Sequence, residues 1–351
     1  MVYNVLRVYY TERNSFMKVI KKIISGIAAF SLCTGIAASA YEFTDMPSGE
    51  MGTALENAVN AGLMDGVTDT SIAPNDHITR AQMATIIVRA FGATEMSDKK
   101  FNDVAKDAWY AESVSKAVAM GAFEGDDDNN FNPENKITFQ ETYTVLSRMF
   151  GFEPYKSSKG NMVSDVDSSV LDSFGDKDQI SGWAVNYAKY IVGNGGWTGI
   201  GGKLKPTDPM TRGEFALIMD KLVYAYVDDQ AAADKLKGVT PDGAVLIRKG
   251  GIKVDGITTD RNLIITQGVD ESGVVVTNTI VNGVTLILGG ADKTPVPNSE
   301  GKIYPDESYV TIAGTYYDVR VGTPYVYLDG SNAAMGYYKA ADGALVYLML
   351  K

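Results

Sequence analysis

Apolar residues recur at helical spacing through the first two-thirds of the chain, and the pattern then changes to one typical of strands. Six helices are predicted, at 54–61, 83–91, 111–120, 142–150, 184–192 and 215–223. After Asp229 the chain has short runs of Val, Ile, Leu and Thr separated by Gly, Asn and Asp, as β-strands do. The sequence therefore predicts a helical part followed by a β-rich part.

The helical part consists of three copies of one unit, each about 60 residues long. In each copy a G-x-x-x-G segment precedes an apolar residue, a spacer and a Pro, and five positions later a Thr opens the second helix. The segments lie at 62–66, 121–125 and 195–199, and the Thr residues are Thr79, Thr138 and Thr211. A two-helix unit cannot bury its apolar face alone, so we expect the three units to pack against one another.

The N-terminus predicts export. From Met17 it reads as a basic stretch, an apolar run over 23–37 and Ala38-Ser39-Ala40 as an A-x-A cleavage site. We expect residues 1–40 to be a signal peptide, with Met17 as an alternative start. Because the run is shorter than the roughly 20 residues of a membrane-spanning helix, no span is expected after cleavage. A retained anchor and lipidation at Cys33 are the weaker alternatives.

Composition and charge narrow the possible functions. Cys33 is the one cysteine, so the mature chain has no disulfide and depends on buried apolar surface. The net charge of −11 argues against nucleic acid as a partner. His77 is the one histidine, which leaves no material for a Ser-His-Asp relay or a multi-histidine metal site. The acidic run 126–130 lacks the Gly and Glu of an EF-hand loop. No cofactor is expected.

The tetrad that opens each second helix fits a capping box, in which Thr and a Glu or Gln three residues later satisfy free backbone N–H groups. A capping box does not explain Arg80 and Arg212, which follow the Thr, where the helix dipole disfavours a cation. Two explanations remain open. Each Arg either binds an anion together with the helix N-terminus or pairs with an Asp of a neighbouring unit.

The units resemble the S-layer homology (SLH) domain, whose motif runs F-x-D-V, a Trp followed by Ala or Tyr, G-x-x-x-G, apolar-x-P and I-T-R-A-E. The matching stretches are Phe43-x-Asp45-Met46 to Ile78-Thr79-Arg80-Ala81-Gln82, Phe101-x-Asp103-Val104 with Trp109-Tyr110 to Ile137-Thr138-Phe139-Gln140-Glu141, and Val163-x-Asp165-Val166 with Trp183-Ala184 to Met210-Thr211-Arg212-Gly213-Glu214. We take the units to be 41–95 (unit 1), 96–155 (unit 2) and 156–229 (unit 3).

The resemblance implies a three-unit spindle of helices that attaches exported proteins non-covalently to a secondary cell-wall polysaccharide with acidic, pyruvylated-type groups. The ligand would lie in grooves between units, and it would supply the anion for the two arginines. The binding residues carried over from the motif are Asp45, Gly66, Arg80, Asp103, Trp109, Asp165, Trp183 and Arg212.

The units depart from the motif at three places. Unit 2 has Phe139 in the Arg position, unit 1 has no Trp before its first helix, and unit 3 carries an insertion at 167–182 before Trp183. We therefore expect two functional grooves rather than three. Trp109 and Trp183 are either sugar-stacking residues or members of the core, since a large indole is usually mostly buried.

Residues 230–240 are expected to be a linker and 241–351 a β-rich domain. Within that domain, 252–254 recurs as 274–276, and 263–265 recurs about 22 residues later as 285–287, as expected for rungs of a parallel β-helix. A β-sandwich remains the alternative. The role of the Tyr-rich end, 309–351, cannot be read from the sequence.

We thus predict a multidomain α + β protein, with an all-α three-repeat spindle and an all-β domain formed by a short parallel β-helix or a sandwich. Its predicted function is non-enzymatic anchoring to the cell wall. The alternatives are an S-layer lattice subunit, with other surface proteins as partners, and a wall-anchored polysaccharide-active enzyme. The candidate catalytic residues of that enzyme would be Lys253, Asp255, Asp260 and Arg261.

Overall fold

The computed structural model describes residues 43–152, 155–156, 162–163, 166–270, 272–277, 279–281 and 285–289, together with five strands nearer the C-terminus. The predicted signal peptide, 1–40, lies outside the described residues. Within the described part of the chain, no helix is long and apolar enough to cross a membrane.

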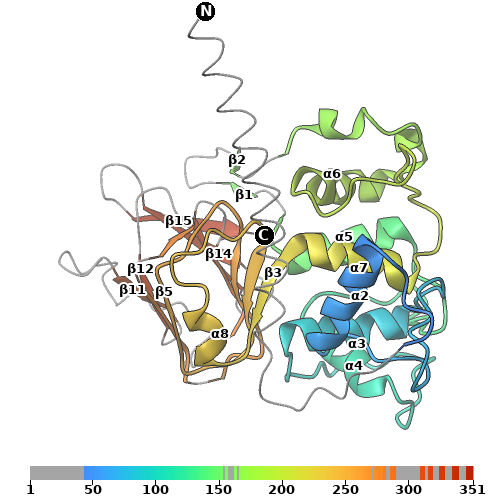
Figure 1. Ribbon diagram of the computed structural model, residues 1–351, viewed down its shortest axis with the longest axis horizontal. Coiled ribbons are helices and arrows are strands. Elements are labelled where there is room, and N and C mark those ends of the chain that lie inside the picture. The colour runs from blue at the N-terminus through green and yellow to red at the C-terminus, as the bar shows by residue number, and fades with distance from the viewer. Residues whose placement is uncertain are drawn as a thin grey trace, which may run out of the picture. The chain divides into compact units, whose positions relative to one another are not determined.

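All six predicted helices are present (Figure 1). The first helices of the three units are α2 (Glu50–Asn60), α4 (Ala111–Ala119) and α6 (Val185–Gly193), and the second helices are α3 (Arg80–Phe91), α5 (Phe139–Met149) and α7 (Arg212–Leu222). Before α6 lie a short hairpin, β1 (Tyr155–Lys156) with β2 (Met162–Val163), and the 3₁₀ turns η1 (Ser168–Leu171), η2 (Lys177–Gln179) and η3 (Gly182–Ala184).

Each second helix begins with the predicted capping box. In α3 the Thr79 hydroxyl oxygen accepts the N–H of Gln82 at 3.2 Å, and the Gln82 side-chain oxygen accepts the N–H of Thr79 at 3.0 Å. Thr138 with Glu141 and Thr211 with Glu214 form the same arrangement. The boxes fix where the second helices start, because they satisfy N–H groups that have no partner inside the helix.

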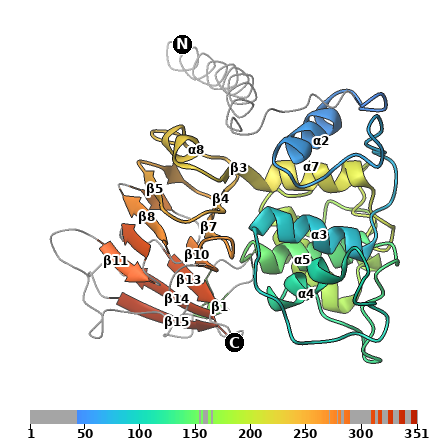
Figure 2. The same ribbon diagram turned by 90° about the horizontal axis from the view of Figure 1, so that it is seen from below.

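The three units close into a ring. The residue before each Thr donates its N–H to its counterpart in another unit: Ile78 to Met210 at 3.0 Å, Met210 to Ile137 at 2.9 Å, and Ile137 to Ile78 at 3.0 Å. Each first helix also packs on the second helix of the preceding unit, so that α4 lies on α3, α6 on α5, and α2 on α7 (Figures 1 and 2). Unit 3 is therefore a neighbour of unit 1.

Strand β3 (Val223–Val227) follows α7 without a break and begins a sheet with the order β15-β14-β13-β10-β7-β4-β3. Strands β3, β4 (Ala244–Ile247), β7 (Leu263–Ile265), β10 (Thr285–Ile287) and β13 (Pro324–Leu328) pair in parallel, and β14 (Ala334–Lys339) and β15 (Leu345–Leu350) complete the sheet in antiparallel fashion.

A second sheet contains β5 (Ile252–Asp255), β8 (Val274–Thr277) and β12 (Thr315–Asp318) in parallel, with β11 (Tyr309–Ile312) antiparallel at its edge. Strands β6 (Thr258–Thr259) and β9 (Ile280–Val281) form a third parallel pair. Both predicted sequence repeats lie in register, with Ile252 opposite Val274 and Leu263 opposite Thr285.

The segment expected to be a linker is part of the folded β-rich region. It contains α8 (Gln230–Asp234), and the Gln230 side chain exchanges two hydrogen bonds with the Lys253 backbone of β5, at 2.8 and 2.9 Å. Because β3 already pairs with β4, the β-rich part (from 223) begins inside the stretch that we assigned to unit 3.

The β-rich part caps the C-terminal ends of helices from all three units. Donors from its loops and strands reach carbonyl groups that have no partner within their helices. The contacts are Arg248 Nη1 to Ala61 and Arg89, the Gly268 N–H to Phe91, Asn262 Nδ2 to Phe150, and Arg261 Nη1 to Asn194, all between 2.8 and 3.3 Å. The helical array and the first strands thus form one packed structure.

Candidate functional site

A groove of about 500 Å³ opens where the three units meet. Unit 1 contributes Arg80, unit 3 contributes Trp183, and unit 2 contributes the loop 122–136 and one side of α5. Its charged lining residues are Arg80, Glu124, Asp126, Lys136, Glu141 and Arg148. The groove is therefore polar and carries charges of both signs, and the aromatic side chains of Phe123 and Trp183 also line it.

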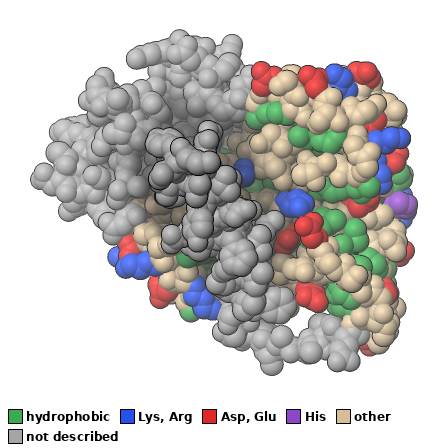
Figure 3. Space-filling model, turned by 45° about the horizontal axis from the view of Figure 1, so that its top comes forward, with side chains coloured by type: hydrophobic (Ala, Val, Ile, Leu, Met, Phe, Trp, Pro, Cys, Tyr) green, Lys and Arg blue, Asp and Glu red, His purple; other side chains and the backbone are tan. Residues whose placement is uncertain are grey.

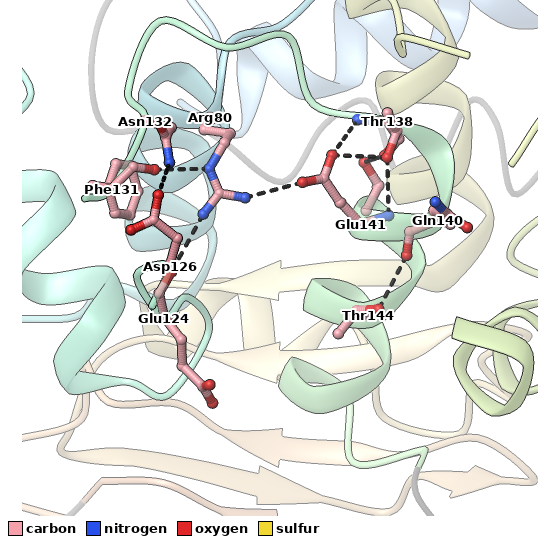
Figure 4. Close-up of polar contacts among 10 residues, drawn as sticks. Arg80, Glu124, Asp126, Phe131, Asn132, Thr138, Gln140, Glu141 and Thr144 are labelled. Atoms are coloured by element: carbon pink, nitrogen blue, oxygen red, sulfur yellow. Dashed lines mark hydrogen bonds and ion pairs between the residues drawn. The ribbon is translucent and has the colours of Figure 1, made fainter. Parts of the chain in front are cut away.

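Arg80 extends from the first position of α3 into unit 2 (Figure 4). Its guanidinium donates to the carbonyl oxygens of Phe131 at 2.9 Å and Glu124 at 3.3 Å, and Nη1 lies 3.3 Å from Oε1 of Glu141. It also lies 5.2 Å from the centre of the Phe131 ring. Burial lowers the pKa of Arg80 and the Glu141 carboxylate opposes that shift, so the guanidinium stays charged.

Arg212 makes the equivalent contacts in the next boundary of the ring. It donates to the carbonyl oxygens of Ile72 at 2.8 Å and Asp65 at 2.6 Å, both in unit 1, and only 7% of its surface is exposed. Both arginines thus join neighbouring units through main-chain acceptors. This differs from the alternative in which each Arg pairs with an Asp side chain of a neighbouring unit, and it gives the arginines a structural role besides any role in binding.

Phe139 fills the corresponding position in unit 2. Its ring is fully buried and lies 5.3 Å from that of Trp197, which stands at the position of Phe123 in unit 2. Without an arginine beside it, the buried Glu214 is 3.3 Å from Lys205. The third boundary therefore has an apolar filling where the other two have a guanidinium.

The two predicted tryptophans are exposed, so the alternative that they are core residues is wrong. Trp109 is 65% exposed and Trp183 is 55% exposed, each just ahead of the first helix of its unit. Unit 1 has Glu50 at this position, twelve residues before the glycine that ends the helix. An exposed indole at the rim of a polar groove is available to a ligand.

The aspartates of the F-x-D motif hold the turn that contains the Pro. Asp45 accepts the N–H groups of Ile72 at 2.8 Å and Ala73 at 2.9 Å, as well as the Ser71 hydroxyl at 2.7 Å. The Ser71 bond is the main cause of the lowered pKa of Asp45. Asp103 accepts the N–H groups of Phe131 and Asn132 at 2.8 and 2.7 Å. Both carboxylates are thus occupied within their own units.

In unit 3 this role belongs to Asp176, which accepts the N–H groups of Leu204 and Lys205 at 2.8 Å each. Asp103 and Asp176 each stand 28 residues before the apolar residue that they bind. Our assignment of Val163-x-Asp165-Val166 to the motif was therefore wrong, and with it the insertion at 167–182. Asp165 itself lies outside the described residues.

Close packing explains the second glycine of each G-x-x-x-G segment. A Cβ at Gly66 would lie 2.5 Å from the Phe43 ring and 2.4 Å from the Thr68 carbonyl oxygen. In unit 3 a Cβ at Gly199 would lie 2.7 Å from Phe174. Only glycine therefore fits at position 66. The matching approach of Gly199 to Phe174 supports Phe174-x-Asp176 as the third motif.

A ring of three two-helix units with a groove between them defines a closed helical-repeat protein. Residues 42–84, 100–142 and 173–216 match the family described as "S-layer homology domain", and the third match begins next to Phe174. The chain is a protein with three S-layer homology domains. In the described part of the chain, no cluster of three or more His, Cys, Asp or Glu could hold a metal ion.

Similar proteins include surface proteins and enzymes. The chain is 31% identical over 208 residues to the surface-layer 125 kDa protein of Lysinibacillus sphaericus, covering 58% of this chain and 16% of that protein. It is 25% identical over 279 residues to the S-layer protein EA1 of Bacillus anthracis, covering 76% and 30%. It is 27% identical over 168 residues to the exoglucanase XynX of Acetivibrio thermocellus, covering 48% and 14%.

The chain thus spans at most 30% of these three relatives. The three domains and the surface-layer relatives indicate secretion to the cell wall or S-layer. On the face in Figure 3, acidic and basic side chains are interspersed over the helical part, without an extended basic surface.

Proposed function

We propose that the three domains anchor the chain by binding a secondary cell-wall polysaccharide that carries acidic, pyruvylated-type groups. The observation that carries this proposal is the groove that is lined by both the exposed indole of Trp183 and the guanidinium of Arg80. An indole face can stack on the apolar face of a sugar ring, while the surrounding amides and charged groups bond to its hydroxyl groups.

The cyclic order of the units supports two such grooves. Arg80 and Trp183 share one groove. At the next boundary the same arrangement brings Arg212 and Trp109 to one groove. Arg212 binds unit 1, and α4, which begins just after Trp109, packs on α3 of unit 1. At the remaining boundary both positions differ, with Phe139 for Arg and Glu50 for Trp. Polymer binding at two boundaries and not at the third is therefore the expected pattern.

We further propose that residues 223–289 form a short parallel β-helix that the anchor presents outward. The in-register parallel pairs support stacked rungs over a sandwich. Two of the four candidate catalytic residues have structural partners: Asp255 lies 2.7 Å from Lys237, and Arg261 donates to Asn194. This supports a display role, and the enzymes among the relatives show only that SLH domains also occur on enzymes.

The proposal is tested by pull-down of the full-length mature chain with purified cell walls, before and after chemical removal of the secondary polymer. The full chain is needed because the β-rich part caps the helices. The variants are Trp183→Ala, Trp109→Ala and the double variant, with Met96→Ala as control, since Met96 is 64% exposed and does not line the groove.

We expect binding to fall at least tenfold in the double variant and to disappear with the polymer, while Met96→Ala binds as the wild type does. Because both indoles are exposed, their removal should leave the melting temperature unchanged. Binding that is indifferent to both tryptophans and to the polymer would refute the proposal.

An S-layer subunit is the second candidate function. The alignment with the S-layer protein EA1 covers 279 residues and so extends beyond the three domain matches. A subunit of this kind would assemble as its concentration rises, which sedimentation of the mature protein, with and without calcium, would detect. A monomer under all conditions would exclude it.

A further inference from the structure

The two arginine grooves differ at the residue that faces the guanidinium. At Arg80 this residue is Glu141, the third residue of α5, whose Oε1 lies 3.3 Å from Nη1 (Figure 4). The third residue of α3, on the unit that Arg212 enters, is Gln82. The ring symmetry therefore pairs Arg80 with a carboxylate and Arg212 with an amide.

The capping boxes fix which atoms face the groove. Oε2 of Glu141 accepts the N–H of Thr138 at 2.8 Å, which leaves Oε1 for Arg80. In Gln82 the oxygen accepts the N–H of Thr79 at 3.0 Å, so the amide NH₂ takes the place of Oε1. An amide NH₂ and a guanidinium are both donors and cannot bond to each other.

Arg212 therefore differs from Arg80 in its free hydrogen-bonding capacity. Its Nε and Nη2 have main-chain acceptors, whereas no acceptor in the described part of the chain contacts Nη1. At Arg80 all three nitrogens are used, and one of the acceptors is a carboxylate. A ligand oxygen at Arg212 would meet donors from two side chains, whereas at Arg80 it would meet Glu141.

The residue after the second glycine differs in the same direction. Asp126 lines the Arg80 groove, and its counterpart in unit 1 is Val67, which is 48% exposed. Two exchanges have the opposite sign, because unit 1 has Asp76 where unit 2 has Asn135 and His77 where unit 2 has Lys136. The side chain of Asp76 is exposed, and its recorded bond to Arg212 joins the two main chains.

We propose that the two grooves take chemically different units of the polymer. The groove of Arg212 and Trp109 binds the acidic group, and the groove of Arg80 and Trp183 takes a sugar without one. Glu141 and Gln82 determine the difference. This proposal rests on the proposed function, because it assigns parts of the same ligand to the same sites.

Reciprocal substitutions test the proposal in the full-length mature chain. Glu141→Gln and Gln82→Glu both keep a side chain that closes a capping box, so equal melting temperatures would show that the fold is intact. The probes are the purified wall polysaccharide and the same polymer after chemical removal of its acidic groups, with affinity measured by calorimetry.

For the wild type we expect weaker binding once the acidic groups are removed. Gln82→Glu should weaken binding of the acidic polymer at least tenfold and make it insensitive to the removal. Glu141→Gln should bind the acidic polymer as well as or better than the wild type. Unchanged binding by Gln82→Glu, or its loss in Glu141→Gln, would overturn the proposal. Wild-type protein that binds neither polymer would instead refute the proposed function itself, and this assignment with it.

Discussion

Nη1 of Arg248, in the β-rich part, donates to the carbonyl oxygen of Ala61 at the end of α2, at 3.1 Å. The same nitrogen donates to the carbonyl oxygen of Arg89, near the end of α3, at 3.3 Å, and the guanidinium also pairs with Asp228. A cation at a helix C-terminus is favoured by the helix dipole. One side chain therefore serves two helix ends.

Arg248→Ala should lower the free energy of unfolding by about 2–4 kcal/mol, because it removes charged hydrogen bonds from a buried site and leaves carbonyl groups unpaired. Chemical denaturation of the full chain measures the change. The control is Lys237→Ala, because Lys237 is exposed and its pair with Asp255 should contribute much less. Equal losses in the two variants would contradict the capping role of Arg248.

Arg80→Ala and Arg212→Ala should each lower the free energy of unfolding by about 1.5–3 kcal/mol, because each removes hydrogen bonds that join two units. Denaturation is measured alongside wall binding, so that a loss of stability is not mistaken for the loss of a contact with the ligand. Arg148→Ala is the control, since Arg148 lines the same groove and its pair with Glu124 is exposed. Arginine variants as stable as this control would show that the contacts between units contribute little.

Asp176→Asn should lower stability by about 1–3 kcal/mol, because the two N–H groups are accepted by different carboxylate oxygens and an amide would set its NH₂ donor against one of them. Asp165→Asn should have the smaller effect, because Asp176 already binds the turn of unit 3. Thermal unfolding of both variants compares the two assignments of the third motif. A larger effect at Asp165 would instead favour Val163-x-Asp165-Val166 as the third motif.

Ala73→Gly should raise stability by up to about 1 kcal/mol, because a residue at positive φ favours glycine. Ala73 has φ 49°, and its counterpart Asn132 has φ 58°. Asn132→Gly is the matched comparison and should gain less, since asparagine tolerates this conformation. Destabilisation by Ala73→Gly, measured by thermal unfolding, would show that Ala73 carries no backbone strain.

Acid should destabilise the protein partly through Asp45. Its pKa is lowered in the folded state by the Ser71 hydroxyl and the N–H groups of Ile72 and Ala73. The stabilisation is thus complete above the unfolded-state pKa of about 4 and is lost as pH falls through the lower folded-state value. Asp45→Asn should be less stable at neutral pH and less sensitive to pH below about 4. Denaturation at pH values from 6 to 2 measures this. If the stability of Asp45→Asn falls with pH as steeply as that of the wild type, this account is contradicted.

The features that could be predicted from the sequence depend on near neighbours. Thr79 and Gln82 are three residues apart, so their capping box and the start of α3 are visible in a short segment. The register of 252–254 against 274–276 follows from a repeat of adjacent rungs. The exposure of Trp109 could not be decided, because burial depends on the neighbouring unit.

The features that could not be predicted depend on distant partners. Arg212 binds Ile72, 140 positions away, and Arg248 binds Ala61, 187 positions away. The error at Asp165 had another cause, since a local V-x-D-V stretch imitates the motif. The distance from Asp to the apolar residue before Pro, which is 28 in both unit 2 and unit 3, would have identified Asp176.

The main-chain ring formed by Ile78, Ile137 and Met210 sets the number of repeats. An open solenoid can lengthen by one repeat at a time, because each addition only moves the terminal surface outward. A closed triangle has no terminal surface, so a fourth unit would have to break one of the three bonds. Duplication of the two-helix units is therefore expected to add three units at a time, and each added set of three forms a separate ring in the polypeptide.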